Sequence, residues 1–279
     1  MRLSVVIPTC NRNDLLERCL EQLTPELQGI SGNDFEIIVT DDSRSFESSK
    51  LQGKFPSVTF LQGPRRGPAS NRNHGARHAR GEWIVFTDDD CVPEPQWLSS
   101  FWKACDGSIA VYEGKTTCKE GVRSPLEHSP VNLNGGFLWS CNMMIHSGLF
   151  KQLGGFDEAF PFPHMEDCDM RERIKATGSM IRFVPSAIVD HPPRKVPWGA
   201  KRARMHESTI YYEKIKQGIP GNRCIPLLWS IFRYRLVAIK HHFAPGSAIS
   251  ALISLVLELA ATAFMCPGWC QKYNRATQR

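Results

Sequence analysis

The sequence lacks the cysteine patterns of a disulfide framework or a zinc site. Its ten cysteines form no C-x-x-C pair, and Cys266 and Cys270 make only an isolated C-x3-C. Scattered thiols of this kind are typical of a reducing cytoplasm. The apolar run at residues 3–7 is stopped by Pro8 and is too short for a signal peptide. We therefore expect the catalytic part of the chain to stay in the cytoplasm.

Aromatic residues are missing from the first of two basic segments, which cover residues 65–80 and 194–206. Proteins that bind single-stranded nucleic acid stack the bases on aromatic rings set among their cations. We therefore expect no nucleic-acid partner. The net charge of +6 is modest, and the two segments suit a solvated face, an anionic ligand or a membrane surface.

The composition is that of a folded, globular protein. Hydrophobic residues make up 42% of the chain and charged residues 22%, which allows a sizeable core. A length of 279 residues suits one large α/β domain with an appendage, or two domains. From Trp198 the sequence becomes basic and helical, so we place a boundary near residue 200, between domains at 1–200 and 201–279.

The first third of the chain alternates between short apolar runs and amphipathic segments. Asp14 and Glu17 have the spacing of a capping box, and Pro68 is suited to the first turn of a helix. This β-α-β-α-β order predicts a doubly wound, mostly parallel sheet. The strands are expected at residues 3–7, 35–40, 58–61 and 83–86, and the second helix at residues 68–79.

Three carboxylates, Asp88, Asp89 and Asp90, follow directly on the apolar run Trp83–Phe86. A run without polar alternation indicates a strand buried on both faces, and ligands of such sheets bind at the carboxyl ends of the strands. Three adjacent like charges are costly unless a cation lies among them, and hard divalent ions take oxygen ligands. The run therefore predicts a metal site. Capping of a helix that begins near Pro93 is the alternative.

The pattern loosens after residue 90. We expect a helix at residues 95–105 and extended segments at 109–115, 137–145 and 180–184. Glu166, Asp167 and Asp169 open a further helix, and they outnumber the acidic residues that capping requires. The last extended segment leads to Asp190 and His191.

An ordered set of motifs resembles those of the family 2 inverting glycosyltransferases, which have the A-type glycosyltransferase fold. The resemblance covers residues 1 to about 193. One departure is Asn71, because an alanine commonly precedes the Arg-Asn pair in that family. The motifs are Pro8-Thr9-Cys10-Asn11-Arg12, Asp41-Asp42-Ser43, Gly67–Gly75, Ala79-Arg80-Gly81-Glu82, Asp88-Asp89-Asp90, Gly154-Gly155-Phe156-Asp157-Glu158 and Glu166-Asp167.

The resemblance implies a role for each matching residue. Asp167 would be the general base, and the metal, Mn²⁺ or Mg²⁺, would be bound by Asp88, Asp90 and His191. For His191, a surface histidine beside prolines remains the alternative. Residues 110–134 match no family motif, and we expect acceptor specificity there and around Trp139–Asn142, with acceptor contacts from Trp139, Asn142 and Glu166. The nucleotide would be held by Pro8, Thr9, Asn11, Arg12, Asp42, Arg72 and Asp88, with Asp42 and Arg72 favouring a uridine or thymidine diphosphate sugar.

The implied reaction moves a sugar to an acceptor hydroxyl of a glycan or glycolipid, as in the synthesis of cell-surface polysaccharide. A glycosidase would instead place two carboxylates around the bond. A sugar-phosphate nucleotidylyltransferase would need a glycine-rich phosphate loop where the chain has Pro8-Thr9-Cys10-Asn11. A metal-dependent phosphohydrolase leaves Asp42 and Arg72 unexplained. A non-catalytic membrane-surface binder does not require Asp167.

Residues 244–266 are mostly apolar, and Glu258 is their only charge. Their length would allow a membrane span, but polar residues recur every three or four positions, which favours an amphipathic helix. We expect this helix to lie at the inner face of the cell membrane, with Trp269 and Tyr273 at the interface. Packing on the protein itself or on a second subunit is the alternative. The polar positions are Ser247, Ser250, Ser254, Glu258 and Thr262, and the nearby basic residues are Lys201, Arg202, Arg204, Arg233, Arg235 and Lys240.

Overall fold

The computed structural model describes residues 2–241 and 245–276, and these residues form two compact units. The first unit consists of Met1–Lys119, Pro130–Glu158 and Glu166–Pro192. The second unit consists of the chain from Pro193 onward together with two earlier segments, Glu120–Ser129 and Ala159–Met165. A single cut near residue 200 therefore misses the two earlier segments, which sequence pattern alone does not assign to the helical part.

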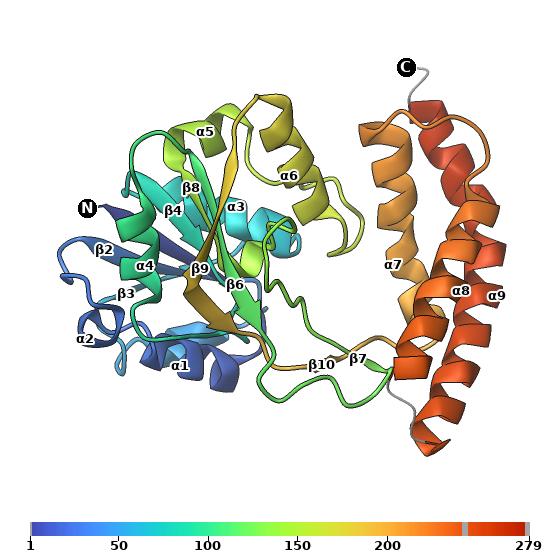
Figure 1. Cartoon of the computed structure of the whole chain (residues 1–279), viewed down its shortest axis with the longest axis horizontal. Coiled ribbons are helices and arrows are strands. Elements are labelled where there is room, and N and C mark those ends of the chain that lie inside the picture. The colour runs from blue at the N-terminus through green and yellow to red at the C-terminus, as the bar shows by residue number, and fades with distance from the viewer. Residues whose placement is uncertain (1, 242–244, 277–279) are drawn as a thin grey trace. The chain divides into compact units, whose positions relative to one another are not determined.

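The first unit is built on a mixed, mostly parallel sheet with the strand order β3-β2-β1-β4-β8-β6-β9-β5 (Figure 1). β1 pairs in parallel with β2 and β4, and β6 pairs in parallel with β9. β8 is antiparallel to both β4 and β6. The carboxyl ends of β1, β2, β4 and β9 therefore all lie along the same side of the sheet. This arrangement confirms the predicted fold. The strands are β1 (Leu3–Thr9), β2 (Phe35–Asp41), β3 (Val58–Gln62), β4 (Trp83–Phe86), β5 (Val92–Pro93), β6 (Val111–Thr117), β8 (Met143–His146) and β9 (Ile181–Asp190).

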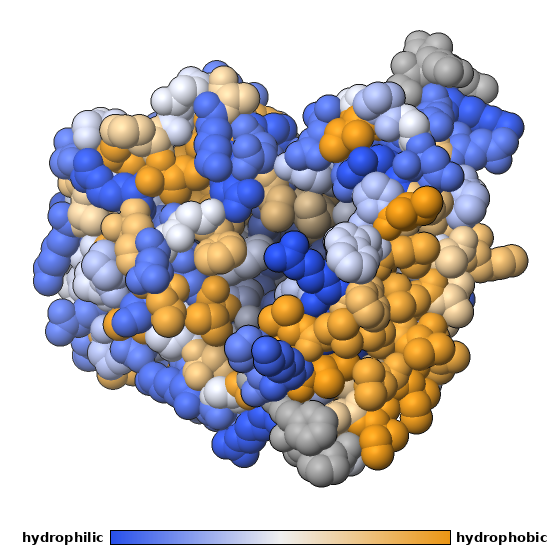
Figure 2. Space-filling view, turned by 45° about the vertical axis from the view of Figure 1, so that its right-hand side comes forward, coloured by the Kyte–Doolittle hydropathy of each residue, from blue (hydrophilic) through white to orange (hydrophobic). Residues whose placement is uncertain are grey.

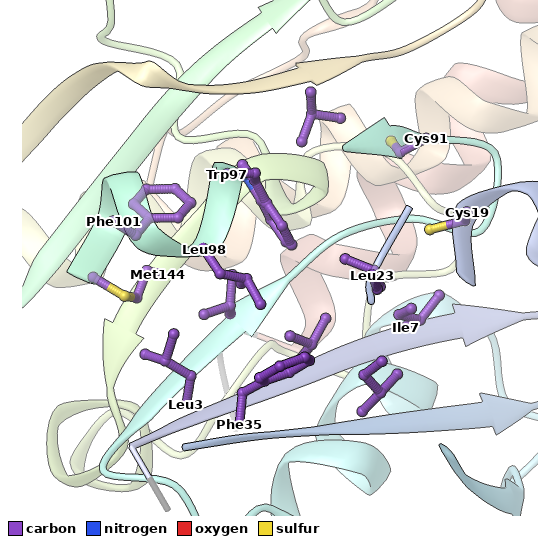
Figure 3. Close-up of a cluster of buried hydrophobic side chains, with 14 of the residues drawn as sticks. Leu3, Ile7, Cys19, Leu23, Phe35, Cys91, Trp97, Leu98, Phe101 and Met144 are labelled. Atoms are coloured by element: carbon purple, nitrogen blue, oxygen red, sulfur yellow. The ribbon is translucent and has the colours of Figure 1, made fainter. Parts of the chain in front are cut away.

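Helices cover both faces of this sheet because its strands are apolar on both sides. Alternate residues of β1 belong to different cores: Leu3, Val5 and Ile7 pack on one face and Val6 on the other. The first core includes Trp97 and Phe101 from α4 (Figure 3). The second is covered by α3, α5 and α6. The helices of this unit are α1 (Asn13–Glu21), α2 (Pro25–Gln28), α3 (Pro68–His78), α4 (Trp97–Ala104), α5 (Ser147–Gln152) and α6 (Glu166–Ala176).

Two local predictions differ from the structure. No side chain caps α1, which begins one residue before Asp14, so the predicted capping box does not form. Of the extended segment predicted at residues 137–145, only the end becomes strand β8. The start is a loop followed by a short 3-10 turn at Ser140–Asn142, because backbone N–H groups of this loop bond to the buried Glu113 instead of to a strand.

The second unit is helical. It contains α7 (Ala200–Tyr211), a π-helical turn (Tyr212–Lys216), α8 (Cys224–His241) and α9 (Pro245–Ala276), with the small strand pair β7 (Glu127–His128) and β10 (Arg194–Lys195). In α9, Ser254, Glu258 and Thr262 are fully buried. Ser254 accepts a hydrogen bond from the backbone of Gly199, at the start of α7. The central part of the polar stripe therefore faces the other helices of the unit.

This orientation corrects the sequence-based account of α9. A helix lying in a membrane interface would turn its polar stripe to water, but here the stripe is inside and the exposed face is apolar. Trp269 and Tyr273 were expected at the interface, and they are instead buried in the core of the unit. By length and composition, Gly246–Ala276 could cross a membrane.

Candidate active site

The acidic turn Asp88-Asp89-Asp90 lies where β4 ends, at the sheet edge that β1, β2 and β9 also reach. The three side chains have different sets of partners, and Asp89 and Asp90 share Arg12. The Asp88 carboxylate contacts the buried Arg72, the Asp89 carboxylate binds Thr9 and Arg12, and the Asp90 carboxylate lies against Arg12 and His191. The turn therefore joins elements that are far apart in the sequence.

Asp89 has a structural role. Its side chain is fully buried, and its carboxylate accepts a 2.6 Å hydrogen bond from the Thr9 hydroxyl and a 2.6 Å ion pair from Arg12 Nη2. Burial raises the pKa of Asp89 to about 7, against the opposing effect of Arg12. The side chains of Thr9 and Arg12, both expected at the nucleotide, are thus engaged in holding the acidic turn. Arg12 also pairs with Asp90 at 3.0 Å.

Asp90 and His191 form a pair suited to a divalent cation. Asp90 Oδ1 lies 3.4 Å from His191 Nε2 and accepts no hydrogen bond from the described residues. His191 Nδ1 is 2.9 Å from the Pro192 carbonyl, and donation there leaves Nε2 as the ligand atom. Carboxylate and imidazole ligands with Asp88 on the same turn fit Mn²⁺ or Mg²⁺. The nearby Cys91 thiol does not suit these hard ions, and burial raises its pKa well above the usual value.

Arg72 is the cation at the centre of the site. It extends from α3, is almost fully buried, and pairs with Asp88. Charges on Asp167 and Glu166 also act on it, and together with Asp88 they keep the pKa of Arg72 above its ordinary value despite burial. This position places the guanidinium among the carboxylates of Asp88, Glu166 and Asp167. Its predicted contact with the nucleotide base stays a prediction.

Asp167 and Glu166 open α6 as an acidic pair, with Glu166 buried and Asp167 half-buried. Burial raises the pKa of both carboxyl groups, and Arg72 acts in the opposite direction on each. Asp167 also receives a hydrogen bond from Ser140, while its Oδ1 is buried and accepts none from the described part of the chain. A carboxylate with an open oxygen and a raised pKa is a stronger base than an ordinary aspartate. Ser140 is a positioning residue that the sequence did not reveal.

The residues expected to contact the nucleobase lie at the ends of β1 and β2. Asp42 accepts backbone hydrogen bonds from Arg65 and Gly67 at 2.9 and 3.0 Å, which shape the loop before α3. Each oxygen keeps lone pairs for a further donor. Asn11 is exposed in the left-handed region with φ 55°, and Pro8 belongs to buried β1. Asp41, in contrast, is consumed by backbone N–H groups of Ser43 and Ser48.

An aromatic pair marks the candidate acceptor side. Phe137 and Trp139 stack with ring centroids 5.3 Å apart and 11° between planes, and Phe137 is 45% exposed. Glu113 holds their loop by accepting hydrogen bonds from the backbone of Gly136 and Leu138. Such stacked rings suit the apolar face of a sugar. The sequence predicted Trp139 but missed Phe137, whose exposure gives it no pattern signal.

Asn142 does not fit its expected contact with the acceptor. Its side chain is buried, receives a hydrogen bond from Trp97 Nε1 at 2.8 Å, and donates to the carbonyls of Lys115 and Ala187. Both amide donors are therefore used inside the protein. Asn142 ties β6, β9 and α4 together below the site, and this prediction was wrong.

Comparisons with known proteins identify the family of this chain. A family model described as Glycosyl transferase family 2 matches residues 4–153. A pre-mycofactocin glycosyltransferase of Mycobacterium tuberculosis is 28% identical over 226 residues, covering 72% of this chain and 45% of the relative. A GalNAc(5)-diNAcBac-PP-undecaprenol beta-1,3-glucosyltransferase of Campylobacter jejuni is 36% identical over 127 residues, covering 43% and 40%. The chain thus spans about half the length of these relatives, or less.

A solved structure extends the likeness across the fold. The mannosyltransferase PcManGT from Pyrobaculum calidifontis, in complex with GDP-Man and Mn²⁺, matches with a TM-score of 0.57 and 20% identity. The match covers 99% of this chain and 83% of that one. The matching family model spans more than half of the chain, and its residues include the β1 loop, Asp42, Arg72 and the acidic turn. The chain therefore belongs to glycosyltransferase family 2.

Proposed function

We propose that the protein is a metal-dependent inverting glycosyltransferase that moves a sugar from a uridine or thymidine diphosphate to an acceptor hydroxyl. The observation that carries this proposal is the division of the acidic groups into two sets. Asp90 with His191 forms one donor set beyond the ends of β4 and β9, and the half-buried Asp167 opens α6 beside Arg72. A single base beside a cation site suits one displacement, whereas a glycosidase would need a catalytic pair.

The chain's own residues account for the proton and for positioning. Asp167 Oδ1 accepts the proton of the acceptor hydroxyl as that oxygen attacks the anomeric carbon. Ser140 orients the carboxylate by hydrogen bonding, and the Phe137–Trp139 stack holds the acceptor sugar in place. Arg72 holds Asp88 by an ion pair, and its charge offsets those of the neighbouring carboxylates. Attack from the face opposite the leaving group inverts the anomeric centre.

Asp88, Asp90 and His191 would hold the Mn²⁺ or Mg²⁺ ion. When bound, the ion would neutralise the charge of the nucleoside diphosphate leaving group. The residues present fit this cofactor, because Asp90 Oδ1 and His191 Nε2 point at each other in a buried position without a shared hydrogen bond. A sugar-phosphate nucleotidylyltransferase would share the sheet and the ion, but it has no use for a base such as Asp167.

The donor nucleotide is tested with a panel of nucleoside diphosphates and Mn²⁺. We expect uridine or thymidine diphosphate to raise the melting temperature more than cytidine or adenosine diphosphate does, because the acceptor-only carboxylate of Asp42 matches the ring N–H of uracil or thymine, which cytosine and adenine lack. Asp42→Asn should reduce that difference. The Pyrobaculum mannosyltransferase binds GDP-Man, so tighter binding of guanosine diphosphate would move the proposal to a purine donor.

We also propose that the second unit attaches the enzyme to the inner face of the cell membrane, with a glycan or glycolipid of the cell surface as acceptor. Figure 2 shows a broad apolar surface on the side occupied by α8 and α9. Its residues are exposed on both helices, while Glu258 is buried. Apolar groups outside and charge inside are the distribution expected of helices in contact with lipid. The exposed residues are Ile225, Trp229, Leu236 and Val237 on α8, and Ile249, Leu252, Ile253, Val256 and Phe264 on α9.

Substitution on this apolar face tests the attachment. Replacing Val256 and Phe264, which are 64% and 87% exposed, with Glu should release the full-length protein from membranes. A charged side chain is costly in the hydrocarbon region of a bilayer. Met180→Glu, at a 68% exposed position of the first unit, is the matched control and should stay membrane-bound. A double variant that still sediments with membranes, or a wild type that stays soluble as a dimer, would refute the attachment.

A further inference from the structure

The second unit encloses a cluster of cationic side chains that the glycosyl-transfer chemistry does not use. Arg202 and His206 come from α7, Arg235 from α8 and Glu258 from α9. Arg202 Nε and His206 Nε2 both bind Glu258 Oε1, at 3.3 and 2.8 Å, and Arg235 Nε lies 3.5 Å from Oε2. One carboxylate is therefore shared by two guanidinium groups and an imidazole.

The charges of this cluster do not balance. Arg235 is 2% exposed, and its Nη2 has no hydrogen-bond partner among the described residues; the same holds for Nη1 of Arg202. Nη1 of Arg235 donates a hydrogen bond to the carbonyl of Pro125 at 2.7 Å. Burying an unpaired guanidinium donor is costly, and each guanidinium offers five donors in a fixed fork. The cluster thus has more donors than the protein supplies acceptors.

His164 reports the same excess of positive charge. Burial and the neighbouring His206, Arg202 and His128 lower the pKa of His164 to about 4. Its ring lies 6.3 Å from that of His206. An anion with several oxygens would satisfy the unpaired donors and offset the surplus charge. Arg202 and His206 each keep 15% of their side chain exposed, so the cluster is open to a ligand on the α7 side.

We propose that Arg202, Arg235 and His206, which Glu258 holds together within the second unit, form a binding site for a phosphate or diphosphate group of the acceptor. This inference rests on the proposed function for the identity of the ligand as an acceptor. The same unit carries the apolar surface of α8 and α9, so a lipid bearing a phosphate could place its chain outside and its head group at the cluster. A free diphosphate has the same chemistry, and the experiment separates the two sources.

Binding is measured by calorimetry on the full-length protein in detergent, with EDTA present so that the metal-dependent donor site does not contribute. The probes are inorganic pyrophosphate, farnesyl diphosphate and farnesol. Wild type should bind both diphosphates, and Arg202→Gln should weaken that binding about tenfold or more, because it removes a charge-assisted bond. Arg204→Gln, at an exposed position of the same helix, is the matched control and should bind as wild type.

Glu258→Gln separates a binding role from a purely structural one. If the cluster binds a diphosphate, removing its carboxylate should strengthen that binding. If the cluster is only a structural ion-pair network, the same substitution should lower the stability of the protein without creating diphosphate binding. Tighter binding of farnesyl diphosphate than of pyrophosphate would support a lipid source, and equal binding would rule that source out. No binding of either diphosphate, or equal binding by the Arg202→Gln and Arg204→Gln variants, would overturn the proposal. Binding of nucleoside diphosphate with Mn²⁺ is followed separately, so failure of the proposed function is recognised independently.

Discussion

Replacing Asp167 with Asn lowers the rate of sugar transfer about 10²–10⁴-fold, the usual contribution of a general base. The amide keeps the shape of the side chain but cannot accept the acceptor proton as a carboxylate does. Donor affinity should stay nearly unchanged, because Asp88, Asp90 and His191 are untouched. Single-turnover kinetics and a binding isotherm for the nucleoside diphosphate measure the two effects separately.

The pH profile supplies the control for this variant. Burial raises the pKa of Asp167, so the wild-type rate should fall as pH decreases through that raised pKa, where the base becomes protonated. The Asp167→Asn variant should lose this acidic limb. A variant that loses donor binding in proportion to its rate would place Asp167 in the nucleotide or metal site instead.

Replacing Asp90 with Asn should abolish turnover and remove the metal-dependent part of nucleoside diphosphate binding. Loss of the ion forfeits several kcal/mol of charge stabilisation, and each 1.36 kcal/mol corresponds to about tenfold in rate. The fold should persist, because Arg12 keeps its ion pair with Asp89. Calorimetry with Mn²⁺ and circular dichroism together measure the two outcomes.

Asp34→Asn is the matched control, since the Asp34 side chain is partly exposed and pairs with Arg2, away from the acidic turn. It should retain both turnover and metal-dependent binding. Asp89→Asn should instead lower the melting temperature, because that carboxylate holds Thr9 and Arg12. Full activity of the Asp90→Asn variant in the presence of a chelator would refute the metal site.

The fold and the position of the acidic turn could be predicted from the sequence because both depend on local pattern. The run Trp83–Phe86 is the observed strand β4, and the carboxylates that follow it lie at the expected edge of the sheet. Parallel pairing with β1 follows from the β-α-β order. In physical terms, an apolar run that is buried on both faces leaves few alternatives for the layers around it.

The directions of individual side chains could not be predicted from pattern. Asp88, Asp89 and Asp90 look equivalent in the sequence, but the partners of Asp89 are Thr9 and Arg12, 80 and 77 residues away. Asn142 looked like a polar residue near the acceptor, yet three buried hydrogen bonds hold it inside. Long-range pairing of this kind has no periodic signature.

The helical unit shows a further limit of periodicity. The spacing of Ser254, Glu258 and Thr262 predicted a stripe on one face of α9, and the structure has that stripe. Spacing alone does not say whether the stripe faces solvent or the interior of the protein. The direction was set by Gly199, which precedes α7, and by Arg202 and His206 of α7, which provide polar partners for α9 inside the unit.

The anomeric configuration of the first product tests the central claim most directly. The donor is an α-linked uridine or thymidine diphosphate sugar, and the product is examined by proton NMR before it can equilibrate. Single displacement with Asp167 as the base predicts a β-linked product in the presence of Mn²⁺. A product that retains the α-configuration would contradict a single displacement with one catalytic base.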